Sequence, residues 1–201
     1  RASMPSRARA AWSLLLFSLP GGARASVLLF EAASEGDVAK LQMLLEKDKY
    51  DVNWRGEYGM SPVHVATLNN HAECVRLLIR AGAKVNQFDN DGWTPLMAAA
   101  AFAEHKMVKM LLDAGANPTR RAQTGHHKGM NAKDLVKDVL EQKGSMATKC
   151  IELLEEGVKT WWAKKEAKER RREGRAAGAD ADAEGLGDAV ADDSADTKSE
   201  L

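Results

Sequence analysis

The chain lacks both a net charge and a long hydrophobic run. Its 29 Lys and Arg balance 29 Asp and Glu over 201 residues, so no overall charge draws it toward nucleic acid or a membrane. The apolar run at 10–19 is shorter than the ~20 residues that a transmembrane helix needs, and we expect no transmembrane segment. A hydrophobic content of 44% is nevertheless enough to bury one elongated core.

The sequence also lacks the signatures of an active site. His126 and His127 have no carboxylate or cysteine at ligand spacing, which argues against a metal site. Neither cysteine, Cys74 or Cys150, lies in an exposed and electropositive setting that would lower its pKa. The Gly-Gly pair at 21–22 is not part of a phosphate-binding loop. We therefore predict no catalytic, cofactor-binding or metal-binding residue, and no enzyme.

The most informative feature is a segment that occurs twice, at 59–82 and again at 92–115. Both copies begin with Gly, carry a hydroxyl residue before Pro, continue through apolar residues at helical spacing and close on Ala-Gly-Ala. Every matching position is offset by 33 residues. A fixed period of this length is typical of a protein built from repeated structural units.

Local signals within each copy predict a pair of helices. Ser61-Pro62, and its counterpart 33 residues later, place a hydroxyl at the N-cap and Pro in the first turn, where no amide donor is lost. Gly82 and Gly115 suit the left-handed position that follows a helix. We therefore expect the second helix of each copy to end at these glycines.

The two copies resemble the ankyrin repeat, whose signature joins G-x-T-P-L-H-x-A-A to V-x-x-L-L-x-x-G-A. Degenerate copies flank them, one beginning at Ala32 and one running from Gly129 to Gly157. The resemblance implies an all-α, ankyrin-type solenoid of helix-turn-helix repeats with projecting β-turn fingers. It divides a domain at 26–157 into four repeats, which lie at 27–55, 56–88, 89–121 and 122–157.

The resemblance also implies structural roles for single residues. His64 and His71 stand where the family places histidines that bond neighbouring backbone. Gly157 would close the fourth repeat, whose surplus residues would form loops at 124–128 and 141–146.

The two cysteines occupy the same point of repeats two and four. At about 10 Å between packed helix layers, their sulfurs would be about 20 Å apart. A disulfide needs Cα atoms within about 7 Å. We expect free thiols, which favours a reducing compartment.

The resemblance implies a binding scaffold, and we predict a monomeric, non-enzymatic adaptor for another protein. Its fingers and concave face carry large or polar side chains at nominally exposed positions of the repeats: Trp54, Tyr58, Met60, Leu68, Phe88, Asn90, Asp91, Trp93, Phe102, Arg120 and Arg121. The alternative is that Phe88, Trp93 and Phe102 pack on one another and stiffen the fingers. Asn53 and Asn86 resemble asparagines that some ankyrin domains offer to hydroxylases, but we interpret them as hydrogen-bonded turn residues.

Charge is segregated beyond the repeats. Residues 158–175 carry eight basic and three acidic side chains, and 176–201 carry eight acidic and one basic. We expect a basic helical extension followed by a disordered acidic tail. The alternative function is therefore a nucleic-acid- or membrane-associated protein that acts through 164–175, with Lys164, Lys165, Lys168, Arg170, Arg171 and Arg172 binding anions. Otherwise this segment is a solvated charged helix.

The two ends of the chain favour different compartments from the repeats. Residues 4–25 have the basic stretch, apolar core and A-x-A site of a secretory signal, and also resemble an organelle transit peptide. The C-terminal Lys-Ser-Glu-Leu resembles a retrieval signal of the endoplasmic reticulum lumen. Because ankyrin-type domains act mostly inside cells, we expect a cytoplasmic or nuclear protein and treat 1–25 as a leader outside the fold.

Overall fold

The computed structural model describes residues 21–46, 50–138, 140 and 144–184. The chain divides into two units, Arg1–Trp161 and Trp162–Leu201. The first 20 residues of the expected leader and the Lys-Ser-Glu-Leu signal lie outside the described residues. The described residues contain helices, turns and one isolated bridge between Arg121 and Asn131, but no strand.

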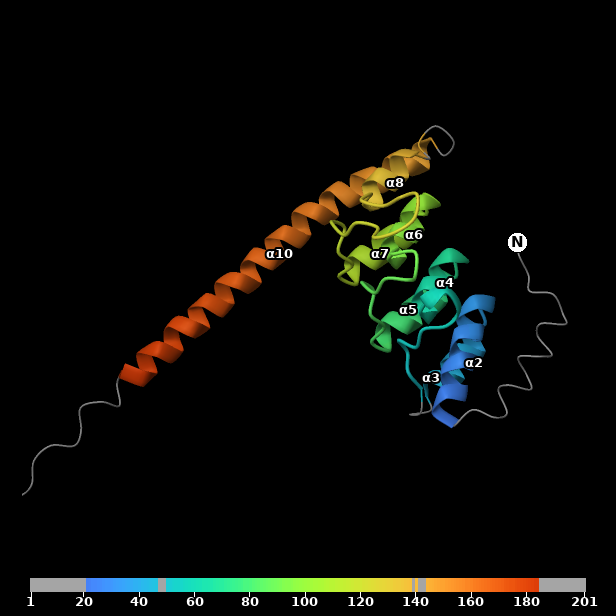
Figure 1. Ribbon diagram of the computed structural model, residues 1–201, viewed down its shortest axis with the longest axis horizontal. Helices are drawn as coiled ribbons and strands as arrows, with labels where there is room; N and C mark the ends of the chain where they lie inside the picture. Colours follow the sequence, from blue (N-terminus) through green and yellow to red (C-terminus); the bar gives the residue numbers. More distant parts are fainter. Residues whose placement is uncertain (1–20, 47–49, 139, 141–143, 185–201) are drawn as a thin grey trace, which may run out of the picture. The chain divides into compact units, whose positions relative to one another are not determined.

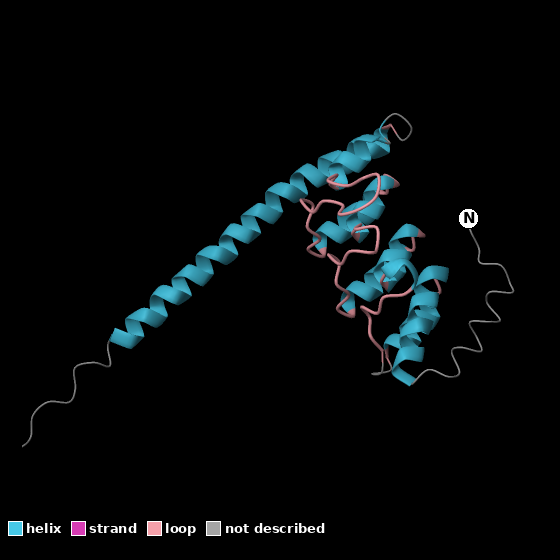
Figure 2. Cartoon of the chain, in the orientation of Figure 1, coloured by secondary structure: helices cyan, strands magenta, loops and turns pink. Residues whose placement is uncertain are grey.

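The first unit is a stack of helix pairs, as the repeat period predicted (Figure 1). The inner helices contact one another in succession; they are α2 (Gly21–Glu35), α4 (Pro62–Leu68), α6 (Pro95–Ala101) and α8 (Ala132–Asp138). The outer helices are α3 (Val38–Leu45), α5 (Ala72–Arg80), α7 (His105–Asp113) and the first part of α10 (Ser145–Glu184). Long loops join successive pairs (Figure 2), and one holds a 3-10 turn, η1 (Glu57–Gly59). The all-α solenoid is confirmed.

The helix ends follow the local signals of the sequence. Thr94 Oγ1 accepts a hydrogen bond from Met97 N at 3.4 Å, and Pro95 fills the first turn of α6. At the other end, Gly82 and Gly115 adopt φ of 87° and 86°, the left-handed conformation predicted for them. The hydroxyl-Pro and Gly positions that recur in the sequence therefore mark recurring helix ends.

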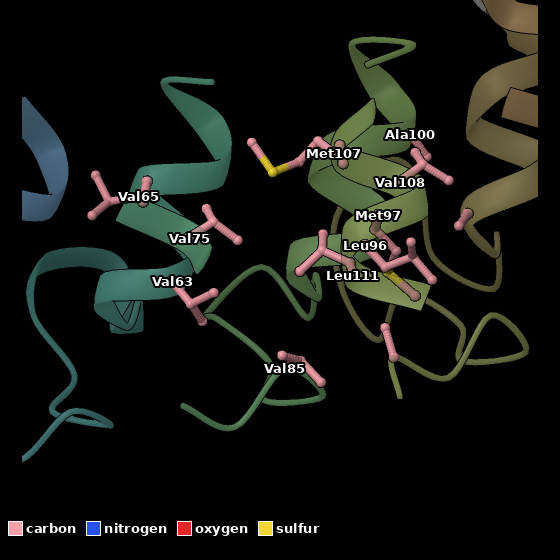
Figure 3. Close-up of a cluster of buried hydrophobic side chains, with 14 of the residues drawn as sticks. Val63, Val65, Val75, Val85, Leu96, Met97, Ala100, Met107, Val108 and Leu111 are labelled. Carbon is pink, nitrogen blue, oxygen red and sulfur yellow. The ribbon is translucent and has the colours of Figure 1, made fainter. Parts of the chain in front are cut away.

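The interior of the stack, between its inner and outer helices, is one continuous hydrophobic core. Val63 and Val75 of the second pair lie in the same cluster as Leu96 and Leu111 of the third (Figure 3). From α10, the residues Ala147, Cys150 and Leu154 join it with 0–1% of their surface exposed. The fourth, degenerate pair therefore shares the core of the clear repeats.

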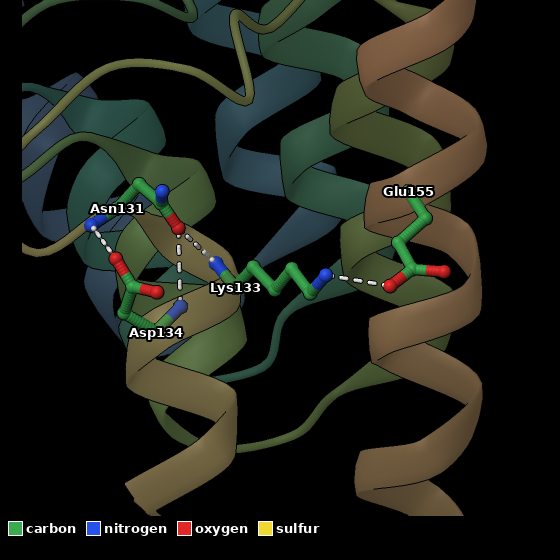
Figure 4. Close-up of polar contacts among 4 residues, drawn as sticks. All are labelled: Asn131, Lys133, Asp134 and Glu155. Atoms are coloured by element: carbon green, nitrogen blue, oxygen red, sulfur yellow. Dashed lines mark hydrogen bonds and ion pairs between the residues drawn. The ribbon is translucent and has the colours of Figure 1, made fainter.

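Polar contacts join the two helices of the fourth pair to each other (Figure 4). Asn131 Oδ1 accepts hydrogen bonds from the amides of Lys133 and Asp134 and thereby caps α8. Lys133 Nζ then donates to Glu155 Oε1 at 2.6 Å, which links α8 to α10 and lowers the pKa of the Glu155 carboxyl.

Gly157 does not end a helix, contrary to the expectation. It lies inside α10, where an added Cβ would stand 2.8 Å from Leu112 Cδ2. The glycine therefore permits close approach between α10 and α7, a role that the sequence signal of a terminal glycine does not distinguish from a cap.

Two expected segment boundaries also differ from those of the helices. Helix α2 begins at Gly21, inside the segment set apart as a leader. Helix α10 continues past residue 175 to Glu184, because the Ala-rich start of the acidic tail favours helix. The rest of that tail, 185–201, lies outside the described residues. None of the described helices has the length and hydropathy needed to cross a membrane.

Candidate protein-binding surface

Three fingers project from the stack with the same backbone register, and each is numbered after the repeat that it opens, from the second to the fourth. Gly56 N donates to Met60 O at 2.9 Å, and Asp89 N donates to Trp93 O at the same distance, 33 residues later. In the fourth repeat the equivalent bond joins Ala122 N to Met130 O at 2.8 Å. That last finger therefore encloses four more residues than the other two.

Hydrogen bonds brace neighbouring fingers against one another. Asn90 N donates to Tyr58 O at 2.9 Å, while Arg55 donates from Nε to Gly59 O at 3.0 Å and from Nη2 to Asn90 Oδ1 at 3.4 Å. On the other side, Thr124 Oγ1 donates to Asn90 O at 3.3 Å. Asn90 is thus bonded to the fingers before and after its own, and the three fingers form a connected row.

Most of the candidate aromatic rings are already packed within the fold. Trp54 meets Phe30 edge-on, with ring centroids 5.8 Å apart. Trp93 meets His127 of the long fourth finger in the same manner at 5.2 Å. Arg120 lies over the ring of Phe88, 4.6 Å from its centroid.

The sequence left open the alternative that Phe88, Trp93 and Phe102 pack on one another. The ring contacts of Phe88 and Trp93 are made with Arg120 and His127, which lie outside that trio. The three packed rings, those of Trp54, Phe88 and Trp93, are half-buried.

Tyr58 is the exception among the finger aromatics. Its side chain is 62% exposed, and its backbone adopts φ 56° and ψ 18°, a left-handed conformation that is unusual for a bulky residue. The bond from Asn90 N to its carbonyl oxygen holds that conformation. Beside it, Asn90 and Asp91 are exposed and Met60 is half-buried.

Leu68 and Phe102 form a separate group. Leu68 is the last residue of α4, and Phe102 is the C-cap of α6. An inner helix of seven residues is about 10 Å long, so these side chains stand one helix length away from the fingers. Phe102 is 50% exposed and Leu68 is half-buried. The eleven candidates thus fall into a finger group and a helix-end group.

Arg121 belongs to the base of the fourth finger. Its Nη1 donates to Gly129 O at 2.6 Å, and its backbone forms the bridge to Asn131. The exposed guanidinium thereby supports the longer loop.

Buried His64 and half-buried His71 are structural, as predicted. His64 Nδ1 accepts from Ser61 N at 3.3 Å, and its Nε2 lies 3.2 Å from Trp93 O. Burial lowers the pKa of His64 below its ordinary value of 6.5, so the ring is neutral and donates from Nε2 to the finger of the next repeat. His71 Nε2 lies 3.1 Å from Ser34 O of the preceding repeat.

The predicted turn asparagines also make hydrogen bonds between repeats. Asn53 Oδ1 accepts from Lys84 N at 2.7 Å, and Asn86 Oδ1 accepts from Asn117 N at 2.6 Å. Asn86 Nδ2 also donates to Gly115 O at 3.0 Å. Their interpretation as hydrogen-bonded turn residues is confirmed.

Both cysteines are free and buried, as expected. Burial raises the pKa of the Cys74 thiol, and raises that of Cys150 to about 11. Within the described part of the chain, no three potential ligands gather into a metal site.

In the second unit, the candidate anion-binding residues are all exposed on α10. Two of them pair with acids on the same helix. Lys165 Nζ lies 3.9 Å from Glu169 Oε1, and Arg170 Nη2 lies 3.7 Å from Glu166 Oε2. Lys165 also stands over the Trp162 ring, 4.7 Å from its centroid.

Three residues of the finger row were absent from the sequence candidates. Arg55, Thr124 and His127 fasten the second and third fingers, although none belongs to the repeat signature. The four surplus residues of the fourth finger were a signal that this loop is distinctive. They did not indicate that it folds back onto Trp93.

Comparisons with known proteins agree with the repeat period. A family model described as ankyrin repeats (3 copies) matches residues 29–122. Cortactin-binding protein 2 of Rattus norvegicus is 44% identical over 69 residues, which are 34% of this chain and 4% of that protein. Target of rapamycin complex 2 subunit AVO2 of Saccharomyces cerevisiae is 36% identical over 84 residues, 42% of this chain and 20% of that protein. Protein phosphatase 1 regulatory subunit 27 of Mus musculus is 30% identical over 91 residues, 45% of this chain and 59% of that protein. The matched part of the chain thus spans 4 to 59% of the length of these relatives.

Proposed function

We propose, from the premise that residues 29–122 are ankyrin repeats, that this chain is a non-enzymatic adaptor whose second and third fingers bind a protein partner. Repeats of this family generally mediate protein–protein interaction. The names of the relatives describe one protein that binds cortactin, one subunit of a complex and one regulatory subunit of a phosphatase. A binding role without catalysis is consistent with all three.

The observation that carries this proposal is the exposed ring of Tyr58. A left-handed backbone costs a residue with a side chain about 1–2 kcal/mol. The exposed ring contributes little to the core, so the fold gains little from this side chain at this position. Strained residues that persist at a surface are associated with function. A tyrosine that offers both an apolar ring and a hydroxyl is suited to anchor a partner.

The bracing of the fingers supports the same surface. Backbone bonds fix Tyr58 to Asn90, and Thr124 fixes Asn90 to the following finger. A surface that is ordered before binding loses little conformational entropy when a partner docks. Exposed Asn90 and Asp91 would form a polar rim around the tyrosine.

Replacing Tyr58 by Ala tests this proposal, with Met43→Ala as the matched control. Both side chains are 62% exposed, but Met43 lies on the outer helix α3 of the first repeat. We expect Tyr58→Ala to weaken partner binding by about 2 kcal/mol, or roughly 30-fold in Kd, because it removes the anchor. Partners captured by the wild type would be identified, purified and titrated against all three proteins.

Circular dichroism and thermal melting would establish that the variants are folded. Equal affinity of the wild type, Tyr58→Ala and Met43→Ala for the captured partner would contradict the finger surface. Loss of binding in Phe102→Ala alone would instead assign recognition to the helix-end group.

A further inference from the structure

The exposed helix in the second unit separates its cations into two sets. Lys165 and Arg170 are neutralised by Glu169 and Glu166 through pairs four residues apart. Within the described part of α10, the remaining cations between 164 and 172 have no ion pair; they are Lys164, Lys168, Arg171 and Arg172. We call these four residues the basic stripe.

The basic stripe occupies one side of its helix. Its members are spaced by four, three and one residues, so at 3.6 residues per turn they fall within an arc of about 100°. Glu166 and Glu169 lie more than about 100° from the centre of that arc. Cations four residues apart on one face repel and destabilise the helix by about 0.2–0.5 kcal/mol per pair. Glu166 and Glu169 are the only acidic side chains between 163 and 172, so no acid of this segment lies within the arc to offset the repulsion.

The composition of the helix decides which kind of partner could supply negative charge to the basic stripe. Residues 163–172 are Ala, Lys, Glu and Arg alone. A helix that docks in a protein groove, or that inserts into a membrane surface, needs a row of large apolar side chains. This segment has none, so its recognition is electrostatic.

We propose that the basic stripe binds the phosphate backbone of a nucleic acid duplex. The stripe is about 12 Å long, and a duplex carries one negative charge per about 1.7 Å of axis, so it would face about seven phosphate charges. Contacts to phosphate oxygens carry no base information, so binding through the backbone is independent of base sequence. The whole chain has zero net charge, so affinity depends on this local face.

Fluorescence anisotropy with a labelled 20-base-pair DNA duplex tests the proposal in the full chain. Four phosphate contacts predict a slope of about −3.6 for log K against log salt. Raising salt from 50 to 200 mM should then weaken binding by about 150-fold. Replacing all four stripe residues by Gln should weaken binding at least tenfold at 50 mM salt, whatever the base sequence of the duplex.

The matched control removes four exposed cations elsewhere by Arg80→Gln, Lys106→Gln, Lys128→Gln and Lys149→Gln. It changes the net charge equally and should leave affinity within twofold. Equal losses in both variants, or no binding of the duplex at 50 mM salt, would overturn the proposal. So would stronger association of the wild type with vesicles containing 30% phosphatidylserine than with DNA, because that result assigns the stripe to a lipid surface. Since every substituted side chain is exposed, unchanged circular dichroism is expected in both variants.

Discussion

At the scale of single residues, polar side chains register one repeat against the next. His64 connects the start of α4 to the finger at Trp93, and Asn86 connects its turn to Asn117 in the following repeat. Each bond spans about thirty residues, which is close to one repeat period. A buried polar group that loses its partner costs about 1–3 kcal/mol, so these side chains select the correct stacking as well as stabilise it.

The lowered pKa of His64 predicts a pH dependence of stability. In the unfolded chain the ring protonates near 6.5, whereas burial keeps it neutral in the fold to lower pH. Below pH 6.5 the unfolded state therefore binds more protons than the folded state. The contribution of His64 to the free energy of unfolding is fully present above pH 6.5 and declines as the pH falls toward the pKa of the folded protein. Urea denaturation at pH 7.5 and 5.5 measures the free energy of unfolding of the wild type and of His64→Gln.

We expect the stability gap between the wild type and His64→Gln to narrow at pH 5.5. A gap of the same size at both pH values would mean that this histidine does not titrate differently in the two states.

At the scale of secondary structure, α10 serves two different environments. Up to Gly157 it is an outer helix of the stack, with Cys150 and Leu154 in the core. From residue 163 to 172 its side chains are exposed. At Gly157 the helix lies close to α7, because an added Cβ would overlap Leu112.

That close approach predicts a strong effect of a larger side chain. Gly157→Val should destabilise the first unit by about 1–3 kcal/mol, because two methyl groups would be forced against Leu112. The control Ala163→Val changes an exposed residue of the same helix and should cost no more than about 0.7 kcal/mol of helix propensity. Chemical denaturation compares the two, and equal stability of both variants would argue against tight packing of α10 on α7.

At the scale of the whole molecule, the repeats share one core but differ in how readily each of them unfolds locally. Each repeat of such a fold contacts only its neighbours, so terminal repeats have one interface fewer and open more readily than central ones. Cys74 lies in the second pair and Cys150 in the terminal fourth pair, and both are buried. The two thiols therefore report on different parts of one stack.

Thiol labelling of single-cysteine variants makes this testable. With its pKa raised to about 11, folded Cys150 should react with an aromatic disulfide at pH 8 at least a hundredfold more slowly than a free thiol. With increasing urea, Cys150 should become reactive before Cys74, because its repeat has a neighbour on one side only. Reaction of either folded thiol at the rate of a free thiol would contradict the buried core.

Much of the repeat architecture was predictable because it is encoded locally. Ser61-Pro62, Gly82 and Gly115 act on the backbone within a few residues, so their sequence positions suffice to locate helix ends. The prediction that a helix ends at Gly157 was wrong, since a glycine required for close packing has the same sequence signal as a glycine that ends a helix.

The candidate surface was less predictable, because exposure depends on residues distant in the chain. Trp93 and Phe88 are exposed by their place in the repeat, yet His127 and Arg120 pack against them. Tyr58 retains its exposure because no such partner reaches it, and its left-handed backbone follows from a bond to Asn90 in the next finger.

By itself, then, the sequence determined the helix pairs and the 33-residue period, since these depend on short-range spacing and on a repeated pattern. The resemblance to a known repeat, and not local spacing, indicated the structural role of His64 and His71. The tertiary structure decided which aromatics remain exposed and how the fingers brace one another. Such contacts depend on the direction of each side chain and on loops of unequal length, and a linear pattern specifies neither.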